Sequence, residues 1–329
     1  MARSDPWLLT CLGVAHDLPL LPHWLDHYLG LGIAPDRVIV ILNAAEAGDP
    51  GLDAATDVLR AARVSRPPVR WIAPYTSGSM WTRRGEVQAQ VCDPDDWVLH
   101  ADVDEFHRWP EPVEDMLARA RELDADCMQG VMIDRLASDG ALAPVRAAPP
   151  ILAQFPVRAA LQDVFGRRGA PYGRGGTVKL MAGRARHRPA RGGHRALPEG
   201  GPRYLYGAAL DAMRSIDRPA VRFAVPTQVD HVHWTDTLPD RLARRLATPG
   251  VSPAGAAYGR DQLDYLAARG GRIDLRDAWV EGRDGAADAW RWPGDLARLR
   301  RRGRAWRMAA PALAATDRVR WRLEWALQR

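Results

Sequence analysis

Residues 38–42, which read "VIVIL", form an unbroken apolar run of mostly β-branched residues, and this run limits the available folds most strongly. Such a run is typical of a strand that is buried on both faces of a parallel sheet. Before it, Leu21, Trp24 and Leu25 repeat at the three- and four-residue spacing of one helix face. Strand and helix patterns alternate up to about residue 135, which predicts a parallel, doubly wound sheet with right-handed crossovers.

The same patterns give approximate bounds for the elements. We expect strands at 6–15, 37–43, 69–73, 96–106, 127–134, 177–183 and 221–234, and helices at 21–29, 52–62, around 87–91, and at 111–125, 239–247, 260–270 and 317–329. Proline, glycine and arginine become frequent after residue 140. We therefore divide the chain into an α/β part at 1–140, a part at 141–238 that builds the second wall of a cleft, and a helical, arginine-rich region at 239–329.

The composition narrows the class of protein. With 329 residues, 47% of them hydrophobic, the chain can bury a large core. Its longest apolar runs are too short to cross a bilayer, and no secretory leader pattern opens the sequence, so we expect a cytoplasmic protein. The three cysteines have no C-x-x-C spacing, and they indicate neither a disulfide framework nor a thiolate zinc site.

The net charge of +6 is unevenly distributed, because the arginines crowd the second half and acids dominate residues 93–126. A basic half suits an anionic partner, such as a phosphorylated small molecule, a lipid surface or a nucleic acid. No nucleic-acid-binding motif accompanies the charge, so no nucleic acid is expected. The basic C-terminal helices either contact the inner face of a membrane peripherally or form a solvated face that closes the domain.

Three acids, Asp102, Asp104 and Glu105, follow the strand segment "WVLHA". Asp102 and Asp104 are separated by one residue, so a strand or the loop after it can turn both toward one point. Two carboxylates so close repel each other unless a cation lies between them. Mg²⁺ or Mn²⁺, with substrate phosphates completing its coordination shell, would be such a cation. In a parallel sheet these acids and Asn43 would share the carboxyl edge, where ligands bind.

Several segments occur in an order that is similar to one enzyme family. They are "LLPHWLDHYLGLGIAPDRVIVILN", "DDWVLHADVDEF", "GVMIDRLASDG", "AQFPV", "VKLMAG" followed by "GGH", and "DHVHW", over residues 8 to about 245. Together they resemble bacterial family-2-like glycosyltransferases of the GT-A type, in the subgroup that contains a D-x-D-E-F signature. The resemblance implies a Rossmann-like, mostly parallel sheet flanked by helices, with a helical C-terminal extension. It also implies a nucleotide-diphosphate sugar as donor, bound by residues 1–140, with the acceptor side at 141–238.

The resemblance assigns roles to the metal and diphosphate site. It implies that Asp102 and Asp104 hold the metal and the diphosphate and that a late histidine completes the metal shell. His231 in "DHVHW" and His194 in "GGH" compete for that place, and a packed, hydrogen-bonded core histidine is the alternative for His231. Asn43 is expected to contact the donor.

Sugar transfer also requires a cation that stabilises the leaving diphosphate and a base that deprotonates the acceptor hydroxyl. Lys179 or Arg184 is a candidate to stabilise the leaving diphosphate, although either could equally be a solvated side chain. Asp134 is the first candidate for the general base, and Glu105 and Asp163 are the next candidates. A salt bridge with a basic residue is the alternative role for Asp134. A retaining enzyme would need no such base.

One segment departs from the family pattern. Relatives have a basic-x-glutamate pair near the end of the first strand, where this chain has "GVAHD". His16 and Asp17 either replace those nucleotide contacts or cap the next helix, and we expect Asp17 to cap it. His23 and His27 lie four residues apart on a helix, and we expect them to have surface or packing roles.

The sequence thus predicts a metal-dependent glycosyltransferase that moves a sugar to an acceptor hydroxyl. The acceptor is unidentified; a cell-envelope glycan, a lipid-linked sugar and a small metabolite are the candidates. A metal-dependent phosphohydrolase that acts on a nucleotide or sugar phosphate is the first alternative. A non-catalytic nucleotide-binding protein on a degenerate GT-A scaffold is the second.

Overall fold

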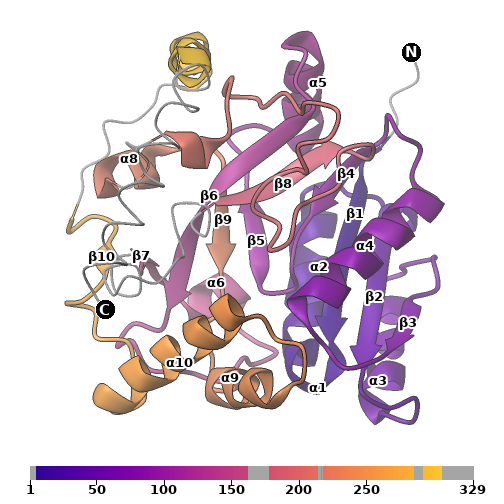
Figure 1. The fold of residues 1–329 in the computed structure, drawn as a ribbon, viewed down its shortest axis with the longest axis vertical. Helices are drawn as coiled ribbons and strands as arrows, with labels where there is room; N and C mark the ends of the chain where they lie inside the picture. Colours follow the sequence, from indigo (N-terminus) through magenta and orange to yellow (C-terminus); the bar gives the residue numbers. More distant parts are fainter. Residues whose placement is uncertain (1–4, 162–177, 214–215, 217, 285–291, 306–329) are drawn as a thin grey trace.

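A computed structural model of the chain, which describes residues 5–161, 178–213, 216, 218–284 and 292–305, is built on one mixed ten-stranded sheet (Figure 1). Its strands are β1 (Trp7–Gly13), β2 (Val38–Ala44), β3 (Val69–Ile72), β4 (Trp97–His100), β5 (Glu105–Arg108), β6 (Cys127–Leu136), β7 (Val157–Ala160), β8 (Val178–Arg184), β9 (Gln228–His231) and β10 (Trp279–Val280). The strand order is β10-β7-β6-β8-β4-β1-β2-β3, and β9 pairs with both β5 and β6.

The first half of the sheet is parallel, since β4, β1, β2 and β3 run in one direction. Alternate side chains of β1 explain why this half is covered on both faces. Leu8 and Leu12 pack with the helices α2 (Leu21–Gly30) and α3 (Pro50–Ala61), whereas Leu9 and Cys11 pack with α4 (Ser77–Val91). The mixed α/β class with a Rossmann-like arrangement is therefore confirmed, and the architecture is consistent with a GT-A fold.

The second half of the sheet is mostly antiparallel. β8 lies between β4 and β6 and runs antiparallel to both, and β7 is antiparallel to β6. β9 is parallel to β6 and antiparallel to β5. This combination brings β5 and β9, which are far apart in sequence, side by side at the carboxyl edge of β4.

The longer helices agree with the periodic segments of the sequence, whereas the short ones were not expected. The helices are α1 (Val14–Asp17), α2 (Leu21–Gly30), α3 (Pro50–Ala61), α4 (Ser77–Val91), α5 (Val113–Glu122), α6 (Ile151–Gln154), α8 (Pro219–Ala224), α9 (Leu238–Ala247) and α10 (Pro253–Ala268). The expected helix at 317–329 lies outside the described residues. Within the described part of the chain, no helix combines the length and the apolar character that crossing a membrane requires.

Two expected strands are interrupted. The strand at 96–106 breaks after His100, because the backbone N–H of Glu105 donates to the carbonyl of Asp102 (3.0 Å) and closes a turn. The expected strand at 221–234 begins instead as helix α8, since Pro219 in its first turn fixes a helical backbone angle. Only its later part forms a strand, β9.

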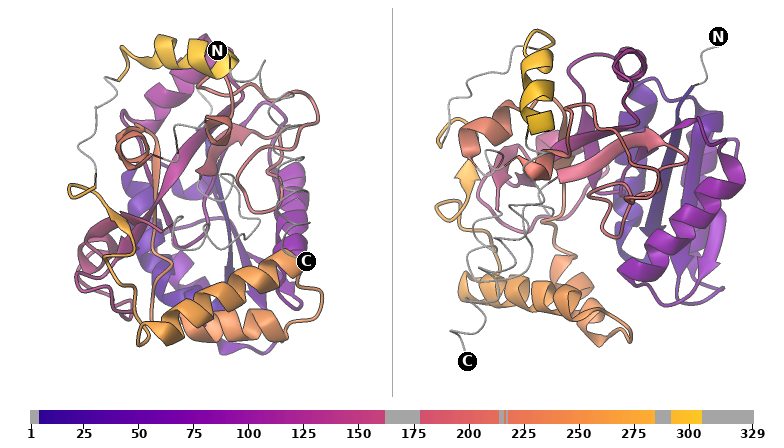
Figure 2. Two further views of the ribbon diagram at one scale, coloured as in Figure 1. Left: turned by 60° about the vertical axis from the view of Figure 1, so that its left-hand side comes forward. Right: turned by 45° about the horizontal axis from the view of Figure 1, so that its top comes forward.

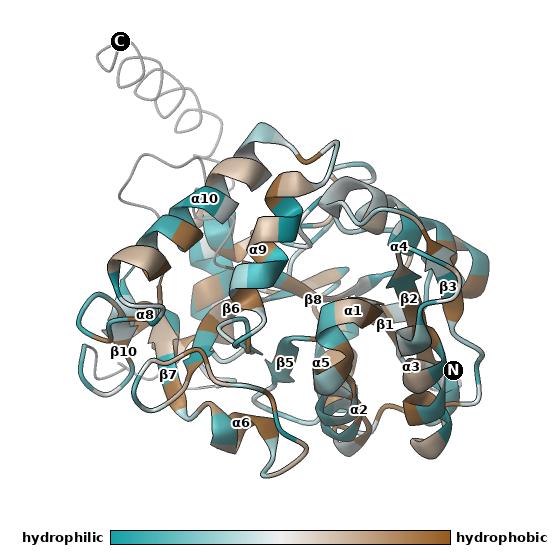
Figure 3. Cartoon of the chain, turned by 90° about the horizontal axis from the view of Figure 1, so that it is seen from below, coloured by the Kyte–Doolittle hydropathy of each residue, from teal (hydrophilic) through white to brown (hydrophobic). Residues whose placement is uncertain are grey.

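Helices α9 and α10 pack against each other, and both views of Figure 2 show this orange pair at the opposite end of the molecule from the yellow segment 296–305. Seen from below, α9 lies beside α10, with α1 across from it (Figure 3). Leu238 and Leu242 bury the inner side of α9, while Arg244 is exposed. The region 239–329 is not entirely helical, because its strand β10 pairs with β7.

Candidate functional site

The register of three strands brings an aspartate, a histidine and a second aspartate together. β9 lies between β5 and β6, with His231 opposite Glu105 on one side and opposite Asp134 on the other. The N–H of Val232 donates to the carbonyl of Asp104 (2.8 Å), which holds the acidic turn against the end of β9. His231 therefore lies between the acidic turn and the carboxyl part of β6.

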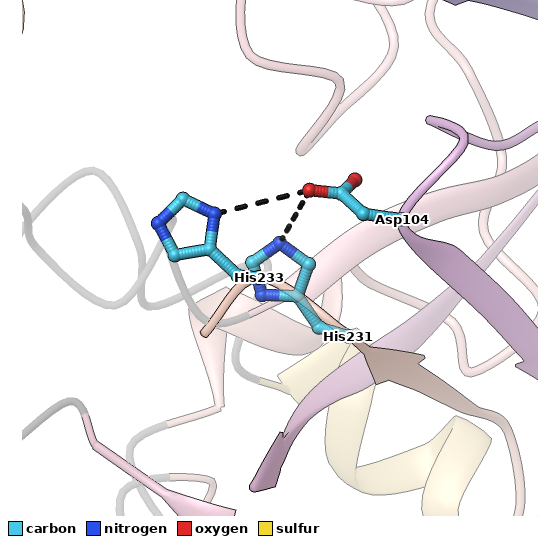
Figure 4. Close-up of side chains that lie close together, drawn as sticks. All are labelled: Asp104, His231 and His233. Carbon is cyan, nitrogen blue, oxygen red and sulfur yellow. Dashed lines mark ion pairs between the residues drawn. The ribbon is translucent and has the colours of Figure 1, made fainter. Parts of the chain in front are cut away.

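Asp104 is the centre of the site. One of its carboxylate oxygens lies 3.6 Å from Nε2 of His231 and 3.8 Å from Nδ1 of His233, and Figure 4 shows both rings directed at that oxygen. The two imidazoles are nearly parallel, with centroids 5.0 Å apart and 19° between their planes. Their separation by two residues places both rings on the same side of the chain.

Charge differs between the two histidines. Burial would lower the pKa of His231, but the hydrogen bonds that its ring donates to the carboxylates of Asp104 and Asp134 outweigh this effect and raise that pKa to about 10. Burial lowers the pKa of His233 to about 4, and the nearby Arg241 adds to this effect. Burial also raises the pKa of Asp104, yet the two histidines hold it well below its usual range. The site thus contains a carboxylate, an imidazolium and a neutral imidazole.

Asp134, the candidate base, is fully engaged in hydrogen bonds. Its Oδ1 lies 3.4 Å from Nδ1 of His231 and accepts from the indole N–H of Trp234 (3.1 Å), while its Oδ2 accepts from the backbone N–H of Leu161 (3.2 Å). These donors outweigh burial and lower the pKa of Asp134. A low pKa weakens a carboxylate as a general base.

Asp102, the first acid of the turn, is neutralised by two buried cations. Arg84 of α4 lies 2.5 Å from its Oδ1, and Lys179 of β8 lies 3.1 Å from its Oδ2. Arg84 also donates to the carbonyl of Leu9 (2.8 Å), so it ties the acidic turn to β1. Burial raises the pKa of Asp102, but Lys179 and Arg84 outweigh it and lower that pKa.

Glu105 closes the acidic turn from the inside. Its Oε1 lies 2.7 Å from Nζ of Lys179, and its Oε2 accepts from the backbone N–H of Asp102 (3.1 Å). Lys179 also donates to the carbonyl of Gly192 (3.1 Å). Glu105 is 2% exposed, so the structure places it as a support of the turn rather than at an open surface.

Helix α2 supports the strand that follows this turn. The hydroxyl of Tyr28 donates to the carbonyl of Glu105 (3.0 Å), and the ring of His27 bonds the carbonyl of His107 (2.9 Å). His23 bonds the carbonyl of Arg146 (2.7 Å). The expected packing roles of His23 and His27 are confirmed.

Arg241 of α9 joins the C-terminal helices to the site. Its guanidinium group lies 3.3 Å from Asp17 and 3.7 Å from Asp104, and it donates to the carbonyl of His233 (2.9 Å). Asp17 accepts from the backbone N–H of Gly13 (3.3 Å) and makes no cap bond to the next helix. The expected capping role of Asp17 is therefore wrong, because its carboxylate turns back toward β1 and Arg241.

The remaining predicted residues lie apart from Asp104. Asn43 is at the carboxyl end of β2 as expected, but its side-chain amide donates to the carbonyls of Trp71 and Ala73 (both 3.0 Å) and holds the edge backbone. Arg184 pairs with Trp97 at the amino end of β4, the opposite edge of the sheet. The structure does not bring Arg184 to the site.

The ring of His194 bonds the carbonyl of Val178 (2.8 Å). Among the described residues, the groups of potential ligand atoms within 4.8 Å of one another include His231 and His233 but not His194. Asp163 lies outside the described residues.

The donor set around Asp104 suits a divalent cation. Nε2 of His231, Nδ1 of His233 and the Asp104 carboxylate lie within 4.8 Å of one another, and ligand atoms that share an ion at about 2.1 Å are roughly 3–4 Å apart. A set of two imidazoles and one carboxylate favours a transition ion such as Mn²⁺ over Mg²⁺, which prefers oxygen ligands only. The second group, Asp102, Asp104 and Glu105, is less available because Lys179 and Arg84 already neutralise two of its acids.

Three residues of this site were not predicted from the sequence: His233, Arg84 and Arg241. His233 was visible in "DHVHW", two residues after His231, a spacing that puts both on one side of a strand. Arg84 and Arg241 gave no such signal, because each lies on a helix among other arginines and only the fold brings it to an aspartate.

No protein-family model matches the chain, and no curated protein matches it. Among solved structures, the crystal structure of S. aureus TarS, a glycosyltransferase, is similar over 80% of this chain and 43% of its own length, with 10% sequence identity and a TM-score of 0.32. The chain thus spans less than half of that protein. The structure of S. aureus TarS 1–349 is similar over 83% of this chain and 77% of its own, with 11% identity and a TM-score of 0.32. At these values the likeness establishes no shared activity, and the chemistry of the site rests on its own geometry.

Proposed function

We propose that the protein is a metal-dependent glycosyltransferase that moves a sugar from a nucleotide-diphosphate sugar to an acceptor hydroxyl. One observation supports this most: Asp104 of the D-x-D-E-F segment faces His231 and His233 at the carboxyl edge of a Rossmann-like sheet. Ligands of such sheets bind at that edge. Asp104 and His231 are also residues that the sequence resemblance names for the metal site, and this supports the proposal.

The divalent ion would be held by Asp104, His231 and His233, and the donor set favours Mn²⁺. Such an ion offsets the charge of the diphosphate leaving group when it is bound. Asp102, Glu105 and Lys179 form the rigid base of the turn that presents Asp104. Lys179 already contacts two carboxylates and a carbonyl, so we assign it to the turn rather than to the diphosphate.

Arg241 is a better candidate than Lys179 or Arg184 for the cation beside the leaving diphosphate. It is the guanidinium group within 4.0 Å of Asp104 in the described part of the chain. An arginine can bind phosphate oxygens through two parallel N–H groups, which suits a diphosphate. We propose that Arg241 contacts the donor diphosphate.

The proposal does not specify the acceptor. A cell-envelope glycan, a lipid-linked sugar or a small metabolite would each supply the hydroxyl. We propose that the reaction is cytoplasmic, with contact to the inner face of the membrane through exposed arginines such as Arg244 of α9. No nucleic acid enters the proposal.

A thermal-shift panel of nucleotide-diphosphate sugars, with and without Mn²⁺, tests the donor class. We expect at least one nucleotide sugar to raise the unfolding midpoint by a few degrees in the presence of Mn²⁺, and the Asp104→Asn variant to lose that effect. If no nucleotide sugar stabilises the wild type in a Mn²⁺-dependent way, the proposal is wrong.

A product assay then separates the activities. Nucleoside diphosphate release that speeds up with an added acceptor supports transfer. Phosphate release that ignores the acceptor supports the phosphohydrolase, and Mn²⁺-dependent binding without turnover supports a non-catalytic protein.

A further inference from the structure

Both histidines beside Asp104 have an oxygen acceptor behind them. His231 directs Nε2 at Asp104 and Nδ1 at Oδ1 of Asp134 (3.4 Å). His233 has its Nδ1 3.8 Å from Asp104 and 3.5 Å from Nη2 of Arg241, and it directs Nε2 at Oε1 of Gln262 (3.4 Å). The two rings use opposite nitrogens, yet each presents one nitrogen to the carboxylate and the other to a fixed oxygen.

The oxygens behind the rings are themselves held in place. Asp134 accepts from Trp234 (3.1 Å) and from the N–H of Leu161 (3.2 Å), so its carboxylate cannot rotate away from His231 without losing those bonds. Gln262 lies on α10 and is completely buried. Strand β6 and helix α10 therefore approach the histidines from two sides.

An acceptor behind an imidazole decides which ring nitrogen carries the proton. A ring that donates its N–H to that oxygen presents the lone pair of its other nitrogen, and the acceptor also makes that nitrogen more basic. Residues in this position commonly contribute about 10–100-fold to metal affinity.

We propose that Asp134 and Gln262 are positioning residues that hold His231 and His233 with their metal-binding nitrogens facing Asp104. This inference rests on the proposed function, because it concerns the ion that the transferase would use. It gives Asp134 a role other than general base, and it brings α10 into the site.

The Asn and Ala variants of Asp134 separate the two roles. An asparagine can still accept the N–H of His231 but cannot take up a proton as a base, whereas an alanine can do neither. For a positioning residue we expect Asp134→Ala to weaken Mn²⁺ binding about 10–100-fold, Asp134→Asn to weaken it less, and both to keep turnover within a few-fold at saturating Mn²⁺. For a general base, both would lose turnover alike, by about 10²–10⁴-fold, with unchanged Mn²⁺ affinity.

Isothermal titration with Mn²⁺ measures affinity without any substrate, and the Mn²⁺ dependence of turnover gives the second reading. Asp139→Asn is the matched control, because Asp139 is an exposed acid shortly after β6 that pairs with Arg272. Gln262→Leu tests the second histidine and should weaken Mn²⁺ binding in the same direction. Circular dichroism shows whether each variant is folded, and Gln262→Leu decides the question if Asp134→Ala is not.

The outcomes distinguish this inference from the proposed function. If the wild type binds Mn²⁺ and a folded Asp134→Ala or Gln262→Leu variant binds it equally well, positioning is wrong while the transferase proposal stands. If the wild type binds no Mn²⁺, both are wrong.

Discussion

Arg84 and Asp102 form a contact of 2.5 Å between the guanidinium group and Oδ1, and Arg84 is only 1% exposed. This buried pair makes the two aspartates of the D-x-D segment unequal. Asp102 is committed to Arg84 and Lys179, whereas Asp104 faces two histidines and Arg241. The first aspartate therefore holds the turn, and the second is available to a ligand.

Asparagine substitutions at the two positions should consequently have different effects. Asp102→Asn leaves Arg84 without its carboxylate partner, and breaking a buried ion pair in this way costs about 3 kcal/mol of unfolding free energy. Asp104→Asn should abolish measurable Mn²⁺ binding and change stability less. Urea unfolding and Mn²⁺ titration of both variants check this. Equal loss of Mn²⁺ affinity with equal stability would contradict the division of roles.

Mn²⁺ binding should release a proton from His231. The two flanking aspartates raise the pKa of His231 to about 10, so at pH 7.5 the ring is an imidazolium and must lose the proton from Nε2 to bind an ion. We expect roughly one proton released per ion, and an apparent affinity that rises about tenfold per pH unit below that pKa. Titrations at pH 7.5 in buffers with different ionisation enthalpies count the protons. A binding enthalpy that does not depend on the buffer would contradict a charged His231.

The sequence is sufficient to predict the parallel half of the sheet and the position of Asp104 at its carboxyl edge. Most side chains of β1 and β2 are apolar on both faces of the strand, which indicates burial on both faces and predicts the parallel half of the fold. An acidic pair directly after such a strand lies at its carboxyl edge wherever the later strands go. The antiparallel half was harder, because Pro219 turned an expected strand into helix α8.

The partners of Asp104 depend on contacts that no local pattern contains. His194 and His231 both occur near apolar strand segments. Only the pairing of β9 with β5 and β6 brings His231, and not His194, next to Asp104. Arg241, Arg244 and Arg245 are alike in sequence on α9. The packing of that helix near α1 decides that Arg241 meets Asp17 and Asp104.

Asp17 should make stability fall as the pH rises from 4 to 6. Burial and the neighbouring Asp104 outweigh Arg241 and raise the pKa of Asp17 from 3.8 to about 6. Over this range the folded state binds more protons at Asp17 than the unfolded state, so each step up in pH favours unfolding. Asp17→Asn does not titrate, and its unfolding free energy relative to wild type should increase by about 2–3 kcal/mol between pH 4 and pH 7.

Chemical unfolding of both proteins at several pH values in EDTA measures that difference. Asp26→Asn is the control, because Asp26 is an exposed acid on the neighbouring helix α2. A constant difference between Asp17→Asn and wild type across the range would show that the pKa of Asp17 is not raised.

Arg241 should contribute more to the unfolding free energy of the metal-free protein than to that of the protein with Mn²⁺. Its guanidinium group supplies positive charge between Asp17 and Asp104, and its removal leaves these two carboxylates with less compensation. We expect Arg241→Ala to lower the unfolding free energy by about 1–3 kcal/mol in EDTA. With saturating Mn²⁺ the difference should shrink, because an ion at Asp104 replaces part of the lost charge.

Arg244→Ala is the matched control, since Arg244 lies on the same helix with an exposed side chain and no ion-pair partner among the described residues. It should change stability by less than about 0.5 kcal/mol in either condition. Unfolding curves of the three proteins, each with EDTA and with Mn²⁺, give the comparison. If Arg241→Ala is destabilised equally with and without Mn²⁺, Arg241 acts only as a link between α9 and α1, and its charge does not compensate Asp104.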